Sequence, residues 1–293
     1  MQIAFHIGAN CTDEDRLLKS TLKNADALLG NGISVPGPGK YRKLLREAID
    51  SLADGAPTDD ARDVLLDAIV EDDNITRLVL SNDNFITIPK RIFDHSVFYH
   101  QAEKKVLGLL QLFPKDAVSL FLGLRNPASF LQETAARAEV GSLSQYLGML
   151  TPLEVQWSDV VRRIKLAAPN TPLFVWCNED TPIIWEELIR LFSGVSADLP
   201  ITGQFDVLSS VITPDGLRDL TARIAKVAPD DIEARQNIVA DIMEAHALPD
   251  QIEDCIEMPE LDATLVAAMT DAYEADLDVI AGMEGVDLIL PFD

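Results

Sequence analysis

Residues 5–18 decide the fold of this chain, and they read Phe5-His6-Ile7-Gly8-Ala9-Asn10-Cys11-Thr12-Asp13-Glu14-Asp15-Arg16-Leu17-Leu18. A short apolar run ends at Gly8, and apolar residues then recur at helical spacing, which predicts a strand, a loop and a helix. In α/β proteins such a loop is a common phosphate site, because unpaired backbone N–H groups and the helix dipole point at it. Here the first helical turn is expected to carry Asp13, Glu14 and Asp15, three carboxylates that would repel a phosphate.

The composition predicts one large, acidic domain. The chain has 293 residues, of which 47% are hydrophobic, so it can bury a substantial core. Its formal net charge of -24 argues against broad contact with nucleic acid or with an anionic membrane, because both need a basic surface. Neither a secretory signal nor a membrane-spanning run is recognisable, so we expect a cytoplasmic protein.

Three further apolar runs predict buried parallel strands, at residues 76–81, 117–124 and 173–177. Helical patterns alternate with them, which predicts a doubly wound parallel α/β sheet with helices on both faces. From residue 213 the pattern becomes helical, and after Lys226 there are 18 acidic residues and a single base, Arg235. We therefore expect one domain over residues 1–293, with an α/β core to about residue 212 and an acidic helical extension beyond it.

Polar side chains at the predicted strand ends are candidate site residues. Ligands of open parallel sheets gather beyond the carboxyl ends of the strands, where Asp83 and Arg125 are expected. Asp83 is a candidate ligand residue, or it forms an Asx turn with its own backbone. Arg125 precedes a proline-started helix and is placed to bind a phosphate by a forked contact, or it forms a structural salt bridge.

A short basic segment stands out in this acidic sequence, with Lys40 and Arg42 at the start of a predicted helix. It is either a solvated helix face or a cationic wall for an anionic ligand.

No metal site is expected. Cys11, Cys177 and Cys255 are far apart and form no CxxC pair, so neither a zinc site nor a disulfide framework is indicated. His95 and His100 would lie about 140° apart if they shared a helix, which disfavours a common metal. Cys11 lies beside a predicted helix start, but the neighbouring carboxylates oppose formation of its thiolate.

Four stretches, taken in order, resemble the bacterial P-loop sulfotransferases: residues 5–9, 32–37, 125–127 and 179–181. The resemblance covers roughly residues 3–195. It implies a P-loop-type α/β core and the transfer of a sulfuryl group from 3'-phosphoadenylyl sulfate to a hydroxyl or an amine.

The resemblance also assigns candidate cofactor residues. In the family the first loop reads close to Pro-Lys-Thr-Gly-Thr-Thr and holds the 5'-phosphosulfate; the matching residues here are Ala9, Asn10, Cys11 and Thr12. Cys11 stands where the family has its lysine, and Asp13 replaces the glycine. Arg125 matches the arginine that holds the 3'-phosphate. The family's serine eight residues later is Glu133 here, so the adjacent Thr134 is the candidate instead.

These departures leave two functions open. Like charges about 4 Å apart repel by roughly 4 kcal/mol at an effective dielectric near 20, so the loop acids disfavour the donor. They suit a helix start instead, with Thr12 as the N-cap and Asp15 at the capping-box position. One hypothesis is a divergent protein that binds another small molecule or a protein near Lys40, Arg42 and Arg125. The alternative is an active sulfotransferase, with cations from the basic segment and Asp83 as the general base.

Overall fold

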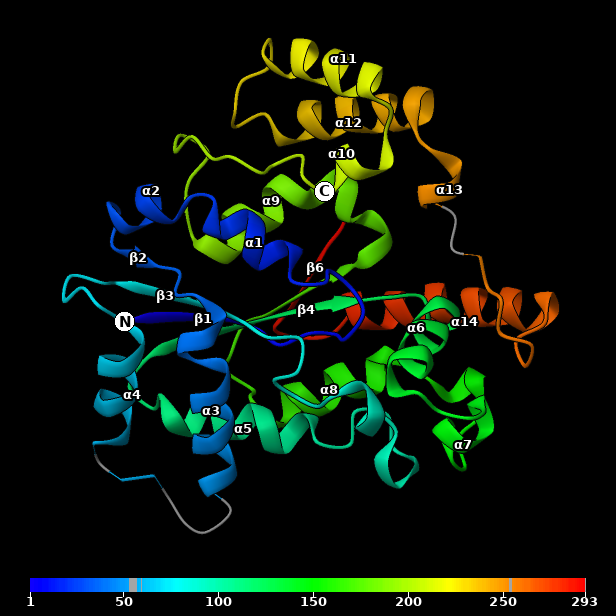
Figure 1. Cartoon of the computed structure of the whole chain (residues 1–293), viewed down its shortest axis with the longest axis horizontal. Helices are drawn as coiled ribbons and strands as arrows, with labels where there is room; N and C mark the ends of the chain where they lie inside the picture. Colours follow the sequence, from blue (N-terminus) through cyan, green and yellow to red (C-terminus); the bar gives the residue numbers. More distant parts are fainter. Residues whose placement is uncertain (53–56, 59, 253–254, 293) are drawn as a thin grey trace.

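A parallel β-sheet forms the centre of the molecule in the computed structural model, which describes residues 1–52, 57–58, 60–252 and 255–292. The sheet has six strands in the order β2-β3-β1-β4-β5-β6 (Figure 1). Their bounds are β1 Gln2–His6, β2 Ile33–Ser34, β3 Arg77–Ser81, β4 Ala117–Leu124, β5 Leu173–Cys177 and β6 Val286–Ile289. The predicted fold class, a doubly wound parallel α/β sheet, is confirmed.

Helices cover both faces of the sheet (Figure 1). One face carries α1 (Arg16–Leu22), α2 (Ala25–Leu29) and α9 (Thr181–Ser193). The opposite face carries α3 (Arg42–Ser51), α4 (Ala61–Ile69), α5 (Ala102–Leu112), α6 (Pro127–Ala138), α7 (Leu143–Leu147), α8 (Trp157–Ala167) and α14 (Ala263–Ala281). Because parallel crossovers are right-handed, the step from β1 to β2 places α1 and α2 on one face, and the steps from β2 to β5, which run the other way, place their helices on the opposite face. The connection from β5 to β6 uses both faces, since α9 lies beside α1 and α14 lies on the opposite face.

Side chains alternate between the two layers along each strand, as the pleat requires. In β1, Ala4 packs in the core beneath α1 and α9, whereas Ile3 and Phe5 pack in the core on the other face. In β4, Phe121 packs in the core beneath α1 and α9, and Leu120 packs in the core on the other face. Both faces of the sheet are therefore buried, which explains why these strands appear in the sequence as continuous apolar runs.

A helical unit stacks over α9, farther from the sheet (Figure 1). It comprises α10 (Leu208–Val211), α11 (Pro214–Ile224), α12 (Ile232–His246) and α13 (Pro249–Ile252). The unit has its own small core, in which Leu220 of α11 packs with Val239 and Ile242 of α12.

The predicted start of the first helix is wrong. Helix α1 begins at Arg16, after Asp15 in the left-handed region at φ 64°, so no acid lies in its first turn. Thr12 is not the N-cap, because its hydroxyl donates to the Ala9 carbonyl oxygen, 2.8 Å away. Asp15 is not the capping-box residue either. Asp13 takes the capping role, since its Oδ2 accepts from the Leu17 N–H at 2.9 Å.

The C-terminal segment is not only helical. Strand β6 lies within it and pairs with β5, so the segment completes the sheet. Helix α14 packs against α6 and α8, and its Met269 and Tyr273 are buried in the main core. The segment is therefore part of the α/β layer as well as the helical unit.

The expected separation of His95 and His100 is wrong because its helical premise fails. A 3-10 turn over Asp94–Ser96 ends before Val97, and the two rings lie 4.6 Å apart between centroids. Among the described residues, no group of three or more His, Cys, Asp and Glu side chains is placed to hold a metal ion.

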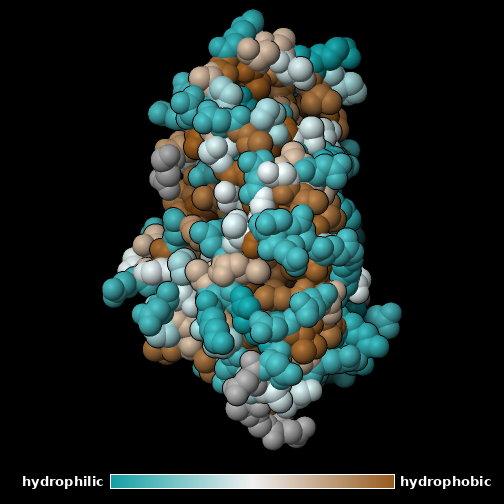
Figure 2. Space-filling view, turned by 90° about the vertical axis from the view of Figure 1, so that its left-hand side faces the viewer, coloured by the Kyte–Doolittle hydropathy of each residue, from teal (hydrophilic) through white to brown (hydrophobic). Residues whose placement is uncertain are grey.

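Hydrophilic side chains are spread along the face shown in Figure 2, with apolar ones between them. Within the described part of the chain, no helix has the length and apolarity to cross a bilayer.

Candidate functional site

A cavity of about 400 Å³ lies at the carboxyl ends of β1, β4 and β5. After β1 and after β4, the chain turns to opposite faces of the sheet. The carboxyl ends of these neighbouring strands are therefore the topological switch point, where ligands of such folds bind. The polar part of its wall includes Arg16 at the start of α1, Arg125 after β4, Glu133 of α6 and Glu179 after β5. The apolar part comes from α9 and the helical unit, with Trp185, Val211, Met243 and Ile252.

Internal hydrogen bonds hold the loop after β1. The Ala9 N–H donates to the Gly123 carbonyl oxygen at 2.9 Å, and the Asn10 N–H donates to the Tyr99 hydroxyl at 3.0 Å. The Tyr99 hydroxyl in turn donates to Asn10 Oδ1 at 2.8 Å, and Asn10 Nδ2 donates to the carbonyl oxygens of Asp83 and Thr87. Two backbone donors that were candidates for the phosphosulfate are thus already paired within the protein.

Each acid of this loop also has a partner. Asp13 accepts from the Leu17 N–H, and Glu14 pairs with Arg137. Asp15 forms a two-pronged contact with Arg42, at 2.5 Å from Nη2 to Oδ1 and 3.2 Å from Nη1 to Oδ2. Burial acts to raise the pKa of Asp15, but the hydrogen bonds and charge of Arg42 outweigh it and hold that pKa below its ordinary value.

The basic segment is occupied by contacts of its own. Besides binding Asp15, Arg42 donates from Nε to the Ser81 carbonyl oxygen at 3.0 Å. Lys40 pairs with Glu71 at the surface. Neither Lys40 nor Arg42 is among the described residues that line the cavity.

Arg125 reaches the cavity from the end of β4. Its Nη1 donates to the Cys11 carbonyl oxygen at 2.8 Å, and its Nε donates to Ser129 Oγ at 3.0 Å. Thr134 is fully buried in α6, with its hydroxyl donating to the Phe130 carbonyl oxygen at 2.7 Å. The cavity wall carries Glu133 at this turn, not Thr134.

Cys11 and Thr12 line the cavity where the family pattern has its lysine and the next residue. Burial is the main reason that the pKa of the Cys11 thiol rises to about 11. The thiol is therefore neutral at pH 7, and this position supplies neither a positive nor a negative charge.

Asp83 lies behind the loop and is not among the described residues of the cavity wall. Its carboxylate accepts from Asn84 Nδ2 at 2.7 Å. Burial first, and then the charges of Asp15 and Asp13, raise its pKa. The Asx turn after β3 is formed by Asn82, whose Oδ1 accepts from the Asn84 N–H at 3.1 Å.

Glu179, in the 179–181 stretch of the resemblance, is a cavity carboxylate that was not among the candidate site residues. It follows β5, and its Oε1 accepts from the Asn126 N–H at 2.7 Å. Burial raises the pKa of Glu179. Its position just after a predicted strand could have identified it as a candidate site residue, because the same position identified Asp83 and Arg125.

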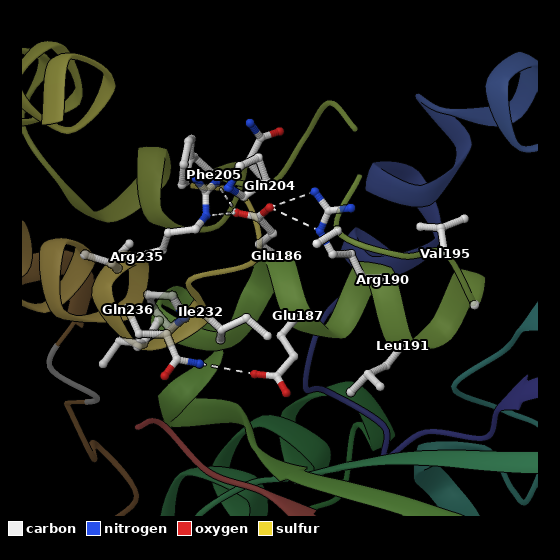
Figure 3. A pocket seen from close by; sticks show the side chains of 16 residues that line it. Glu186, Glu187, Arg190, Leu191, Val195, Gln204, Phe205, Ile232, Arg235 and Gln236 are labelled. Carbon is white, nitrogen blue, oxygen red and sulfur yellow. Dashed lines mark hydrogen bonds and ion pairs between the residues drawn. The ribbon is translucent and has the colours of Figure 1, made fainter. Parts of the chain in front are cut away.

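A second cavity, of about 360 Å³, lies on the other side of α9, between α9 and α12 (Figure 3). Pro182, in the first turn of α9, lines both cavities. None of the sequence-based candidates belongs to this second cavity, which we call the α9–α12 groove.

Comparisons with known proteins add one likeness in fold. A crystal structure described as that of a sulfotransferase from Alicyclobacillus acidocaldarius is 16% identical to this chain, with a TM-score of 0.39. The match covers 85% of this chain and 98% of the other. No family model matches the sequence. No curated protein matches it either. The strand order of the sheet, and not this distant likeness, carries the assignment of fold class.

Proposed function

We propose that this chain is a binding protein with a sulfotransferase-like α/β fold, that its ligand site is the cavity at the carboxyl ends of β1, β4 and β5, and that it does not transfer sulfuryl groups. The observation that carries this proposal is the internal pairing of the loop after β1. Arg42 and Arg137 neutralise Asp15 and Glu14, and a neutral Cys11 thiol stands where the donor needs a lysine. An anionic donor would have to compete with the protein's own carboxylates for these arginines.

The build of the cavity supports binding of some other molecule there. It encloses about 400 Å³ between charged side chains such as Arg125 and Glu179 and apolar ones such as Trp185 and Met243. Small-molecule sites are usually built in this way, from apolar walls with a few fixed polar groups.

Calorimetry with 3'-phosphoadenosine 5'-phosphate, the product form of the donor, tests the proposal. We expect neither heat of binding nor thermal stabilisation at about 1 mM, whereas a ligand at 100 times its Kd would add about 2.7 kcal/mol of stability. Stoichiometric binding that is lost in Arg125→Ala and kept in Arg218→Ala would overturn it. Arg218 is the matched control because it forms an exposed ion pair with Asp215 on α11.

The alternative function is an active sulfotransferase, and one observation favours it. Arg16, Arg125 and Glu179 line one cavity, which brings together two cations and a carboxylate whose pKa is raised by burial. A raised carboxyl pKa suits a general base. In this alternative Glu179, with Asp83 as the earlier candidate, would accept the proton of the hydroxyl or amine. It predicts turnover of 3'-phosphoadenylyl sulfate that Arg125→Ala abolishes.

A further inference from the structure

The α9–α12 groove has mostly apolar walls around a polar cluster. Its apolar wall residues are Ile183, Leu191, Val195, Phe205, Ile232 and Val239. Figure 3 shows the Glu186 carboxylate between the guanidinium groups of Arg190 and Arg235, with Ile232 between this cluster and the pair formed by Glu187 and Gln236. Apolar walls with a few fixed polar groups are the usual build of a small-molecule site.

Glu186 has no acceptor capacity left. Its Oε1 accepts from Arg190 Nε at 3.2 Å and Nη2 at 2.9 Å, and its Oε2 accepts from Arg235 Nε at 3.1 Å and Nη2 at 2.5 Å. A carboxylate offers about four lone-pair sites, so these bonds saturate it. The three side chains are only 12–17% exposed, and a ligand cation would have to break this cluster to reach Glu186.

Donor capacity, in contrast, remains at Arg235. Within the described part of the chain, Arg190 has one N–H left, on Nη2, because its Nε and the other Nη2 hydrogen bond to Glu186 and its Nη1 donates to the carbonyl oxygens of Ser196 and Leu199, at 2.8 and 3.0 Å. Arg235 Nη1 donates to none of the described residues, whereas Nε and Nη2 both donate to Glu186. The groove therefore offers a guanidinium edge to an acceptor.

The groove is formed in advance of any ligand. Arg190 ties the 196–199 segment to α9 and so fixes one wall. Gln236 is fixed as well, because its Nε2 donates to Glu187 at 3.1 Å and its Oε1 accepts from the Phe292 N–H at 2.7 Å. A fixed wall reduces the ordering cost of binding.

We infer that the α9–α12 groove binds a small monocarboxylate with an apolar body, whose carboxylate accepts from Arg235. A cation finds Glu186 saturated and Glu187 engaged. A multiply charged anion would leave more buried charge unbalanced than a monocarboxylate does, since two arginines already face two glutamates in the groove. An uncharged apolar molecule would leave the Arg235 donor unused.

Paired titrations of the full chain test this inference, with octanoate and 1-octanol as probes of matched apolar length. We expect octanoate to bind at least tenfold more tightly than 1-octanol, as followed by calorimetry and by NMR shifts of groove methyl groups. Equal affinities, or no octanoate binding at about 5 mM, would overturn the inference.

Variants assign the carboxylate to Arg235. Arg235→Gln should weaken octanoate binding about tenfold and leave 1-octanol unchanged. Arg223→Gln is the matched control, because Arg223 pairs with Asp241 outside the groove. Ile232→Asp provides a second test that keeps the ion pairs, since Ile232 is 43% exposed and its replacement adds a repelling carboxylate. Unchanged octanoate affinity in both folded variants would show that Arg235 does not hold the ligand.

Discussion

The loop after β1 and the α9–α12 groove both bring arginines and carboxylates together, but they differ in what they leave for a ligand. In the loop, Asp13 and Asp15 take a backbone N–H and a guanidinium from the protein itself. In the groove, one carboxylate is shared by two arginines, and Arg235 keeps a donor edge. Unspent hydrogen-bond capacity, more than the density of charge, therefore decides what each region can offer a ligand.

The largest expected effect comes from removing the residue that holds the loop together. Asn10→Ala deletes the partner of the Tyr99 hydroxyl and of the Asp83 and Thr87 carbonyl oxygens, all in or beside the core. Buried groups left unpaired cost about 1–3 kcal/mol each, so we expect a loss of about 3 kcal/mol in urea unfolding. Octanoate binding in the groove should persist in the folded variant, because none of the described groove residues hydrogen-bonds to Asn10.

Asn31→Ala is the matched control, since among the described residues the exposed Asn31 side chain donates only to the Ala27 carbonyl oxygen. It should change stability by less than about 0.5 kcal/mol. Equal effects of the two variants would contradict the role given to Asn10.

Arg42→Gln tests the pairing of the basic segment with the loop. We expect a loss of about 1 kcal/mol at pH 7, because the pair is partly exposed but two-pronged. Asp15 has a lowered pKa in the fold, so its contribution is present above the unfolded pKa of about 4 and is lost as the pH falls through the lower folded pKa. The difference from the unmodified chain should therefore shrink below about pH 4.

Chemical denaturation at several pH values measures this effect, with Arg218→Gln as an exposed ion-pair control. A difference that stays constant from pH 7 to pH 3 would indicate that Arg42 acts by packing and by its hydrogen bond to the Ser81 carbonyl oxygen, and not by its charge on Asp15.

Asp83→Asn tests whether the loop retains surplus negative charge. Because the folded pKa of Asp83 is raised, the fold favours its protonated form, and this contribution to stability is lost as the pH rises through the folded pKa. The neutral amide should raise the free energy of unfolding at pH 7. This gain should be smaller than the loss caused by Asn10→Ala. The gain should vanish below about pH 4, and the exposed Asp67→Asn should show none of it.

The smallest expected effect is a difference in the rates at which two cysteine thiols are labelled. Cys11 is 4% exposed and its pKa is raised to about 11, whereas Cys255 is exposed. Iodoacetamide at pH 7.5 should label Cys255 at least about tenfold faster than Cys11, as measured by peptide mass spectrometry, and unfolding in urea should remove the difference. Rapid labelling of Cys11 in the folded chain would show that the loop opens readily.

Much of the fold was predictable because buried parallel strands leave a strong local pattern. The strands at residues 77–81, 117–124 and 173–177 all stand where the apolar runs predict them. Strand β6 was missed because Val286–Ile289 is a short edge strand whose Asp287 is exposed. The predicted start of α1 was misplaced because Asp15 adopts a left-handed conformation, which cannot be predicted from its residue type.

The candidate sites were harder to predict because their contacts join distant residues. The sequence carries the acids of the loop and the bases of the next helix, but not the contact by which Arg42 neutralises Asp15. Glu186 and Arg190 are four residues apart on a helix, a recognisable pair. Arg235 joins them only through the packing of α12 on α9, which no local pattern encodes.

The place of β6 has a consequence for synthesis on the ribosome. Strand β5 acquires its outer neighbour only when Val286–Ile289 has been made, after the whole of residues 178–285. Until then the edge of β5 is uncovered and open to pairing with another chain. The edge of β5 thus depends for its protection against aggregation on a strand that is made only after residues 178–285.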